Sequence, residues 1–140
     1  MKNGKYAFHT GGEPSPWWQV DLGQSEPLGR VVVYNRLDYA PGLHNADNLR
    51  ILTSDDGTGW ILRHDNRRRH FGGVGSTPPL EVTFAPGELT ARFVRLQVLS
   101  QEPVFFHLDE VEIYGSADNA KNRALRRSAD QSSLSPWSTA

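Results

Sequence analysis

The stretch RFVRLQV at residues 92–98 decides the fold class, because from Val94 onward every second side chain is aliphatic and those between are polar. Successive side chains of a β-strand point to opposite faces, so this pattern predicts a strand with one buried and one partly exposed face. The stretch LDEVEIY at residues 108–114 repeats the pattern, with Val111 and Ile113 sharing the buried face. Two such strands indicate a sheet that covers a core on one side.

Short apolar runs separated by Gly, Pro, Asn and Asp extend this pattern to residue 115, with no helical period among them. The run VVVY at residues 31–34 is continuously apolar and predicts a central strand covered on both faces. The sequence SDDG at residues 54–57 predicts a hairpin, because Asp-Gly tolerates the positive φ angles of tight turns. We therefore expect an all-β fold, an antiparallel sandwich or barrel. The expected strands are Trp18–Leu22, Arg30–Asn35, Leu49–Thr53, Trp60–His64, Leu80–Phe84, Ala91–Leu99 and His107–Tyr114.

The composition is that of one ordinary domain with a substantial core, since 37% of the 140 residues are hydrophobic and four are Trp. A net charge of −1 provides no overall field that attracts nucleic acid or acidic membrane, so we expect neither as a partner. The run Arg67–Arg69 is expected to be a solvated loop tip. The absence of cysteine excludes a disulfide framework and a cysteine-ligated zinc site.

Targeting signals are not evident in this chain. The first six residues contain no apolar region of the kind that a signal peptide needs, and no stretch is apolar enough to span a bilayer. The localisation therefore stays undetermined at this level.

The sequence patterns of common enzymes are missing as well. There is no cysteine nucleophile, no Gly-x-Ser-x-Gly elbow and no Gly-rich phosphate loop. His64 and His70 flank the arginine run without a zinc-ligand spacing, and the pair Asp55–Asp56 falls in the predicted hairpin turn, where solvation explains it. We expect a binding module and not an enzyme.

Five blocks in order along residues 9–115 resemble the discoidin domain, also called the coagulation factor 5/8 type C domain. This resemblance implies an eight-stranded, jelly-roll-like, galactose-binding-domain-like sandwich whose loops at one end bind ligand. The blocks are HT … PWWQVDLG at residues 9–23, YNRLD at 34–38, SDDG … W at 54–60, ARFVRL at 91–96 and LDEVEIYG at 108–115.

The fucose-binding F-type lectins are the branch of this superfamily that the chain resembles most. Their sugar site is a His, 26 residues, Arg-x-Asp, four residues and a second basic residue. Here His9 is followed by 26 residues and then by Arg36 and Asp38, but Leu43 stands where the second basic residue is expected. The adjacent cysteines that often follow the Asp in these lectins are replaced by Tyr39-Ala40.

The resemblance assigns a role to each matching residue. Arg36 supplies planar N–H donors to sugar oxygens, and neutral His9 supplies one donor or acceptor. Asp38 orients Arg36. At two positions outside the matching pattern, we expect Tyr39 to stack on the apolar face of the sugar, as the lectins' disulfide would, and His44 to compensate for the missing basic residue.

Purely structural interpretations of these residues stay open. His9 is then a cap bonded to backbone, and Arg36 with Asp38 is an ion pair at the end of a central strand. The pair Trp17–Trp18 is expected to pack the end of the sandwich rather than to contact ligand.

The lectins also bind one calcium ion, through an early loop and a Glu on the last strand. Glu110 stands at that last-strand position, and Asp109 beside it offers a backbone carbonyl, so the resemblance implies these two as calcium ligands. Most ligands of the early loop have no counterpart here. The alternative for Glu110 is a charged residue on an exposed strand face.

The tail differs in composition from the rest and is rich in Ser, Ala, Asn and Arg. Its segment NRALRRSADQSS at residues 122–133 resembles the first strand of a discoidin domain, which is missing from the front of the chain. We therefore divide the chain into a discoidin-like domain at 1–115 and a linker plus strand-like segment at 116–140. That segment either begins a following repeat or is a permuted strand that completes this domain.

These observations lead to one functional hypothesis with two alternatives. We expect a lectin-like accessory module that binds a glycan or monosaccharide, such as fucose or a related sugar, within a larger protein or beside neighbouring discoidin repeats. The first alternative is a lipid- or protein-binding module whose loops carry an apolar spike, either Leu43 with Tyr39 or Phe105 with Phe106. The second is a spacer repeat with a decayed sugar site.

Overall fold

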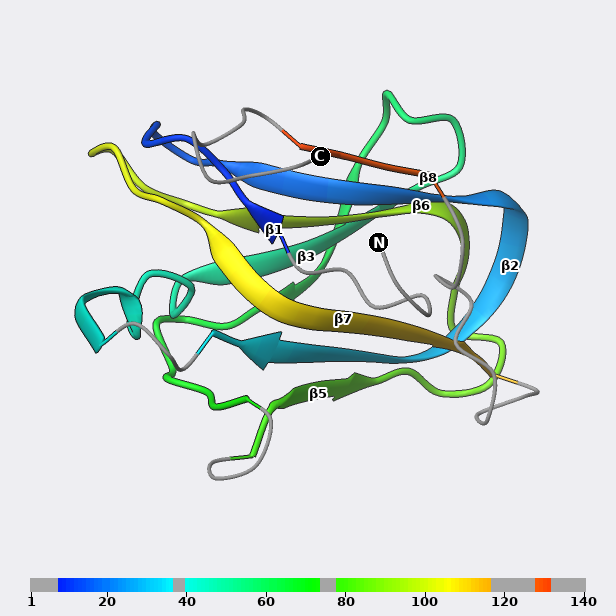
Figure 1. The fold of residues 1–140 in the computed structure, drawn as a ribbon. Coiled ribbons are helices and arrows are strands. Elements are labelled where there is room, and N and C mark those ends of the chain that lie inside the picture. Colours follow the sequence, from blue (N-terminus) through cyan, green and yellow to red (C-terminus); the bar gives the residue numbers. More distant parts are fainter. Residues whose placement is uncertain (1–7, 37–39, 74–77, 117–127, 132–140) are drawn as a thin grey trace.

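The computed structural model describes residues 8–36, 40–73, 78–116 and 128–131 of the chain (Figure 1). No helix in this part is long and apolar enough to cross a membrane. The regular elements are β1 Phe8–His9, β2 Trp17–Asn35, the 3₁₀ turn η1 Ala40–Gly42, β3 Leu49–Ser54, β4 Ile61–Asp65, β5 Leu80–Thr83, β6 Thr90–Val98, β7 His107–Gly115 and β8 Ser128–Gln131.

All strand pairs are antiparallel, and the long strand β2 belongs to both layers of the fold. The strand order is β1-β7-β2-β6-β3-β4, with β5 and β8 also paired to β2. The first half of β2 pairs with β6 and β8, and its second half pairs with β7 and β5. In Figure 1 this strand turns over at one side of the molecule and continues into the second layer. The expected all-β, jelly-roll-like sandwich is thus confirmed.

One correction concerns β2, which the sequence suggested was two strands with a connection between them. The chain stays paired through that region because a register shift against β6, between Asp21 and Glu26, absorbs the extra residues. Gly23 has a φ of 90°, and its N–H donates to Asp21 Oδ1 at 2.8 Å. Arg92 on β6 donates to both oxygens of the same carboxylate, at 2.8 and 2.9 Å. The polar residues that looked like a loop therefore form a bulge that bends the strand.

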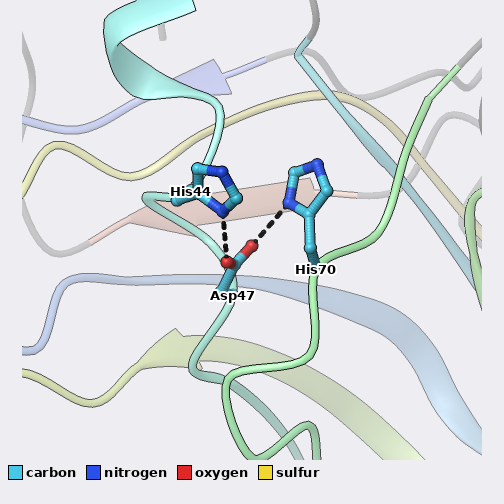
Figure 2. Close-up of side chains that lie close together, drawn as sticks. All are labelled: His44, Asp47 and His70. Atoms are coloured by element: carbon cyan, nitrogen blue, oxygen red, sulfur yellow. Dashed lines mark hydrogen bonds and ion pairs between the residues drawn. The ribbon is translucent and has the colours of Figure 1, made fainter.

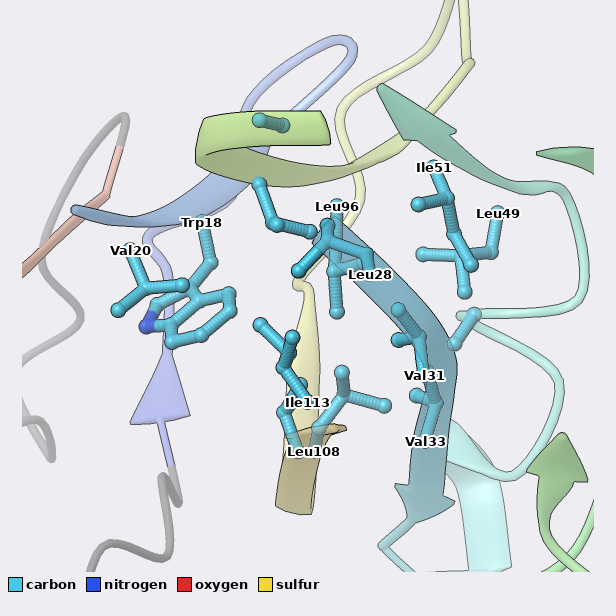
Figure 3. Close-up of a cluster of buried hydrophobic side chains, with 14 of the residues drawn as sticks. Trp18, Val20, Leu28, Val31, Val33, Leu49, Ile51, Leu96, Leu108 and Ile113 are labelled. Atoms are coloured by element: carbon cyan, nitrogen blue, oxygen red, sulfur yellow. The ribbon is translucent and has the colours of Figure 1, made fainter. Parts of the chain in front are cut away.

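The core lies between the two halves of β2 and is built from the aliphatic positions of the alternating strands (Figure 3). The run Val31–Val33 is buried along its whole length, as its continuous apolar character predicted. On β7, Leu108 and Val111 are both buried although they are three residues apart. An irregularity in the pairing with β2 allows this, since Tyr34 pairs with Glu110 and Asn35 with Leu108.

The tryptophan pair divides between core and surface. Trp18 is buried in the core, whereas Trp17 is only half-buried and faces the outside of the sheet. The Arg95 guanidinium lies 4.3 Å from the centre of the Trp17 ring and 4.2 Å from that of Trp60. Arg95 also donates to Gln19 Oε1 at 3.0 and 2.8 Å. Core packing was thus the correct expectation for one tryptophan of the pair.

The other strand ends agree with the predicted ranges to within a residue or two. Trp60, Phe84 and Leu99 were expected within strands and fall just outside them. The run Arg67–Arg69 is exposed, as predicted for a solvated tip.

The predicted hairpin at residues 54–57 joins β3 to β4. Gly57 has a φ of 82° and donates its N–H to Ser54 Oγ at 2.9 Å. The Asp56 carboxylate accepts the N–H groups of Gly59 and Thr58, and these bonds hold its pKa well below the usual range. Both Asp55 and Asp56 are exposed, so a role in shaping a solvated turn accounts for them.

The tail contributes a strand to this domain. The backbone of β8 pairs with β2 from Trp18↔Gln131 to Asp21↔Ser128. This pairing covers an edge of the β2–β6 layer that would otherwise expose unpaired N–H and C=O groups. The origin of the segment, as part of a following repeat or as a permuted strand, stays a prediction.

Leu96→Ala should reduce the free energy of unfolding by about 2–5 kcal/mol, because Leu96 is fully buried and its truncation leaves a cavity. Leu62→Ala is the matched control, since Leu62 is 46% exposed and its loss should change stability by no more than about 0.5 kcal/mol. Chemical denaturation followed by tryptophan fluorescence measures both. Equal losses would contradict the assigned core.

A candidate ligand-binding end of the sandwich

The antiparallel ladder brings the backbones of His9 and Arg36 to one end of the molecule. His9 on β1 pairs with His107 on β7, and the next residue of β7, Leu108, pairs with Asn35 at the end of β2. Arg36 follows immediately and is half-buried. Adjacent strands lie about 4.8 Å apart, so the two backbones are roughly 10 Å apart across β7. His9 and Arg36, with 26 residues between them in the sequence, therefore lie at the same end of the sandwich, on either side of β7.

Two of the predicted sugar-site residues, Asp38 and Tyr39, lie outside the described residues. For His9 the structure describes the backbone, which places the residue but not its ring. The parts of the predicted sugar site that can be placed are therefore Arg36 and the backbone of the strand ends on either side of it.

Asn35 anchors the chain that leaves β2. This residue is fully buried, and its amide Nδ2 donates to the carbonyls of Leu43 at 2.8 Å and Phe71 at 3.2 Å. Its backbone N–H donates to the Gly72 carbonyl at 3.0 Å. One side chain thus ties the segment around Leu43 and the segment around Phe71 to the end of the strand that carries Arg36.

The segment that follows η1 packs against the start of β7. Asn45 Nδ2 donates to the Phe105 carbonyl at 3.0 Å and lies 3.4 Å from His107 Nε2. The Phe105 ring is 42% exposed and rests on Gly12, where an added Cβ would lie 3.1 Å from the ring. Phe106, in contrast, is fully buried.

The predicted apolar spikes are therefore only partly present. The lipid- or protein-binding alternative has Phe106 projecting with Phe105, and this is wrong because Phe106 packs into the core beside β7. Leu43 is half-buried, and its carbonyl is held by Asn35. Among the described members of these pairs, Phe105 is the one whose ring is exposed at the ligand end.

A groove of about 870 Å³, lined by both polar and apolar side chains, lies alongside these loops. Two of its walls are joined by serines: Ser15 Oγ donates to the Ser100 carbonyl at 2.9 Å, and Ser15 N–H donates to Ser100 Oγ at 2.9 Å. Hydroxyl and amide groups that both donate and accept suit the hydroxyls of a sugar. Its lining includes Ser15, Asn45, Asn48, Ser100, Gln101 and Glu102. Ser15 and Ser100 lie 85 residues apart in the chain, so no local sequence pattern indicates this groove.

His44 also lines this groove, and the structure joins it to two residues that the sequence did not connect with it. His44 Nδ1 lies 2.6 Å from Asp47 Oδ2, and His70 Nδ1 lies 2.9 Å from Asp47 Oδ1 (Figure 2). The two imidazole rings are 4.3 Å apart between centroids. His70 comes from a different loop, so no local pattern predicts this cluster.

Among the described residues, no group of three or more His, Asp or Glu side chains close enough to share a metal ion includes Glu110. Glu110 is 7% exposed, so the alternative interpretation, a charged residue on an exposed strand face, is wrong: it lies on β7 opposite Tyr34, in a half-buried layer. Burial and then the neighbouring Glu112 raise the pKa of Tyr34 to about 12, and its hydroxyl donates to Glu112 Oε1 at 3.2 Å. The side chain of Asp109 lies outside the described part. Calcium binding through Glu110 and Asp109 stays a prediction.

The F5/8 type C domain family matches residues 2–111, and this chain belongs to that family. The chain is similar to the lectin domain of lectinolysin complexed with Lewis b antigen, with 31% identity and a TM-score of 0.60 over 77% of this chain and 70% of that one. A histidine mutant of the same domain, also complexed with Lewis b, gives a TM-score of 0.61 with the same identity and coverage.

A more distant likeness is to the CBM32-5 module of Clostridium perfringens in complex with GalNAc-β-1,3-galactose. The two chains are 15% identical, and the TM-score is 0.54 over 80% of this chain and 96% of that one. At this identity the likeness concerns the fold alone. No curated protein sequence matches the chain.

Asn35→Asp should destabilise the protein more than Asn35→Ala at neutral pH. The alanine variant leaves two carbonyls without their donor, at about 1–3 kcal/mol, whereas an ionised Asp also points a buried negative charge at them. Burial raises the folded-state pKa of such a carboxyl, so the deficit should shrink as pH falls toward ~4 and the acid becomes a donor. Urea denaturation between pH 7 and pH 4 measures this. An aspartate variant as stable as wild type at pH 7 would remove Asn35 from its anchoring role.

Proposed function

We propose that this chain is a carbohydrate-binding module whose ligand is fucose or a related sugar of a larger glycan. The observation that carries the proposal is its 31% identity to a lectin domain complexed with Lewis b antigen, over more than three quarters of the chain. The binding site is the end of the sandwich formed by the end of β1, the end of β2, the segment around residues 43–48 and the start of β7.

Arg36 is the principal recognition group in this proposal. A guanidinium carries five N–H donors in a rigid plane and stays charged at all relevant pH values, which suits the oxygens of a sugar ring and its hydroxyls. Its position is well supported, because it follows the buried and anchored Asn35 directly. His9 contributes a second polar group, and Asp38 orients the guanidinium.

The apolar side of the site compensates for the residues in which this chain departs from the lectin pattern. A sugar presents a C–H face that packs on flat apolar surfaces, and aromatic rings supply such surfaces in binding sites. Phe105 offers an exposed ring at this end, backed by Gly12, and Tyr39 is a second candidate. His44 adjoins Leu43 and has a 73% exposed side chain, so its remaining ring nitrogen, Nε2, is a replacement partner for a sugar hydroxyl.

The module has no catalytic role of its own in this proposal. Joined to other domains or to further discoidin repeats, it would hold those domains at a glycan surface and raise their effective concentration there. Calcium, if it binds, acts through the last strand and is tested by the same titrations.

Arg36→Ala should abolish saturable binding of L-fucose and of Lewis b oligosaccharide, because the main donor group is removed. Arg69→Ala is the matched control: it removes the same charge from an exposed turn and should leave affinity unchanged. Isothermal calorimetry with and without calcium measures binding, and circular dichroism verifies folding. Unchanged affinity in folded Arg36→Ala protein would overturn the assigned site.

Absence of binding in the wild-type chain at millimolar sugar would overturn the fucose proposal. The exposed ring of Phe105 would then favour a lipid or protein partner, and vesicle sedimentation distinguishes a lipid surface from the rest.

Leu43→Arg should strengthen fucose binding, because it restores a basic residue at the spacing found in the lectins. One charged hydrogen bond is worth about 1.5 kcal/mol or more, which corresponds to roughly tenfold in affinity. Leu43→Gln controls for the loss of the leucine and should give a smaller gain. No gain with arginine would show that the backbone at Leu43, which Asn35 holds, does not aim this side chain at the sugar.

A further inference from the structure

The segment that carries His44 and Asp47 is a run of tight turns. Asn45, Asp47 and Leu49 donate their N–H groups to the carbonyls three residues earlier, at 3.1 to 3.2 Å. This repeat of three, as in a 3₁₀ helix, places residues at i and i+3 on the same side. His44 and Asp47 therefore face one another, and the Asp47 side chain is only 15% exposed.

His70 reaches the same place through a second turn, which the buried Asn66 ties to the first. Asn66 is 3% exposed, and its amide donates to the Asp47 carbonyl at 3.1 Å and to the Arg69 carbonyl at 2.6 Å. Arg67 and Arg68 adopt positive φ angles of 50° and 61°, which turn the chain back on itself. A buried amide thus fixes the backbone on both sides of the cluster, independently of any contact between the imidazoles and the carboxylate.

The three side chains offer one ligand atom each, and all of these atoms lie within 4.8 Å of one another. Figure 2 shows Nδ1 of each imidazole against a different oxygen of Asp47. Because an ionised carboxylate only accepts hydrogen bonds, each Nδ1 is the donor. In a tetrahedral zinc site neighbouring ligand atoms lie roughly 3.3 Å apart, given bonds of about 2.0 Å. Small rotations of the exposed imidazoles bring the cluster to that spacing.

We propose that His44, Asp47 and His70 form a binding site for a divalent transition-metal ion of the zinc class. The ion replaces the two shared Nδ1 protons, and solvent completes its coordination, since the side chains of His44 and His70 are 73% and 37% exposed. This site does not depend on sugar binding.

The donor set determines which ions are accepted. Imidazole nitrogens suit zinc, copper and nickel, whereas calcium requires six or more oxygen ligands and finds one carboxylate here. We expect zinc and nickel to bind and calcium to leave the cluster unchanged.

Isothermal titration calorimetry of the tag-free chain with zinc tests the proposal. A parallel titration uses calcium. We expect saturable binding of one zinc ion per chain that His44→Ala and His70→Ala each weaken at least tenfold. His64→Gln is the control, because His64 lies outside the cluster and glutamine can keep its hydrogen bond to Asn66. Equal zinc affinity in wild type and in the His44→Ala/His70→Ala double variant would overturn the site.

The ring nitrogens supply a readout that mere stabilisation by these residues would not move. Without metal, ¹⁵N spectra should show Nδ1 of His44 and His70 protonated; with zinc, both should carry the proton on Nε2 and shift together at one equivalent. Asp47→Asn should suppress that change while the chain stays folded. A shift confined to other histidines, or an equal response to calcium, would contradict the proposal.

Discussion

The structure depends on strand β2 being shared between two layers. This one strand of 19 residues pairs with β6 and β8 in its first half and with β7 and β5 in its second. Because both layers share one backbone, they close over a common core once the chain bends between Asp21 and Glu26. The last residue of β2, Asn35, begins the ligand end of the sandwich.

The loops at that end are held by polar side chains bonded to backbone groups. Loops lack the regular ladders that satisfy N–H and C=O groups in strands, so buried carbonyls there need other partners. Four asparagines bond such carbonyls: Asn35 those of Leu43 and Phe71, Asn45 that of Phe105, Asn48 that of Leu99, and Asn66 those of Asp47 and Arg69. Rigid strands and braced loops together present the exposed groups of the site in defined positions.

Two kinds of chemistry adjoin one another at this end, and they share His44. The proposed sugar site follows the residue spacing of the F-type lectins, which the chain resembles, and departs from it at Leu43 and at Tyr39-Ala40. The His44–Asp47–His70 cluster lies at the groove beside that end of the sandwich. Their closeness follows from topology, since β2, the segment after η1 and the turn at residues 66–70 all meet around Asn35 and Asn66.

The sequence by itself determined most strands and the buried run Val31–Val33, because these depend on local periodicity. It also determined the hairpin at Gly57, through turn chemistry, and the spacing of His9 and Arg36, through the family pattern. Only the tertiary structure decided that β2 is one bent strand, since its bulge exists through pairing with β6 and the contact between Arg92 and Asp21. It also decided that Phe105 is exposed while Phe106 is buried. The cluster of His44 with His70 lay beyond sequence reasoning, because two distant loops create it and no local pattern records which loops meet.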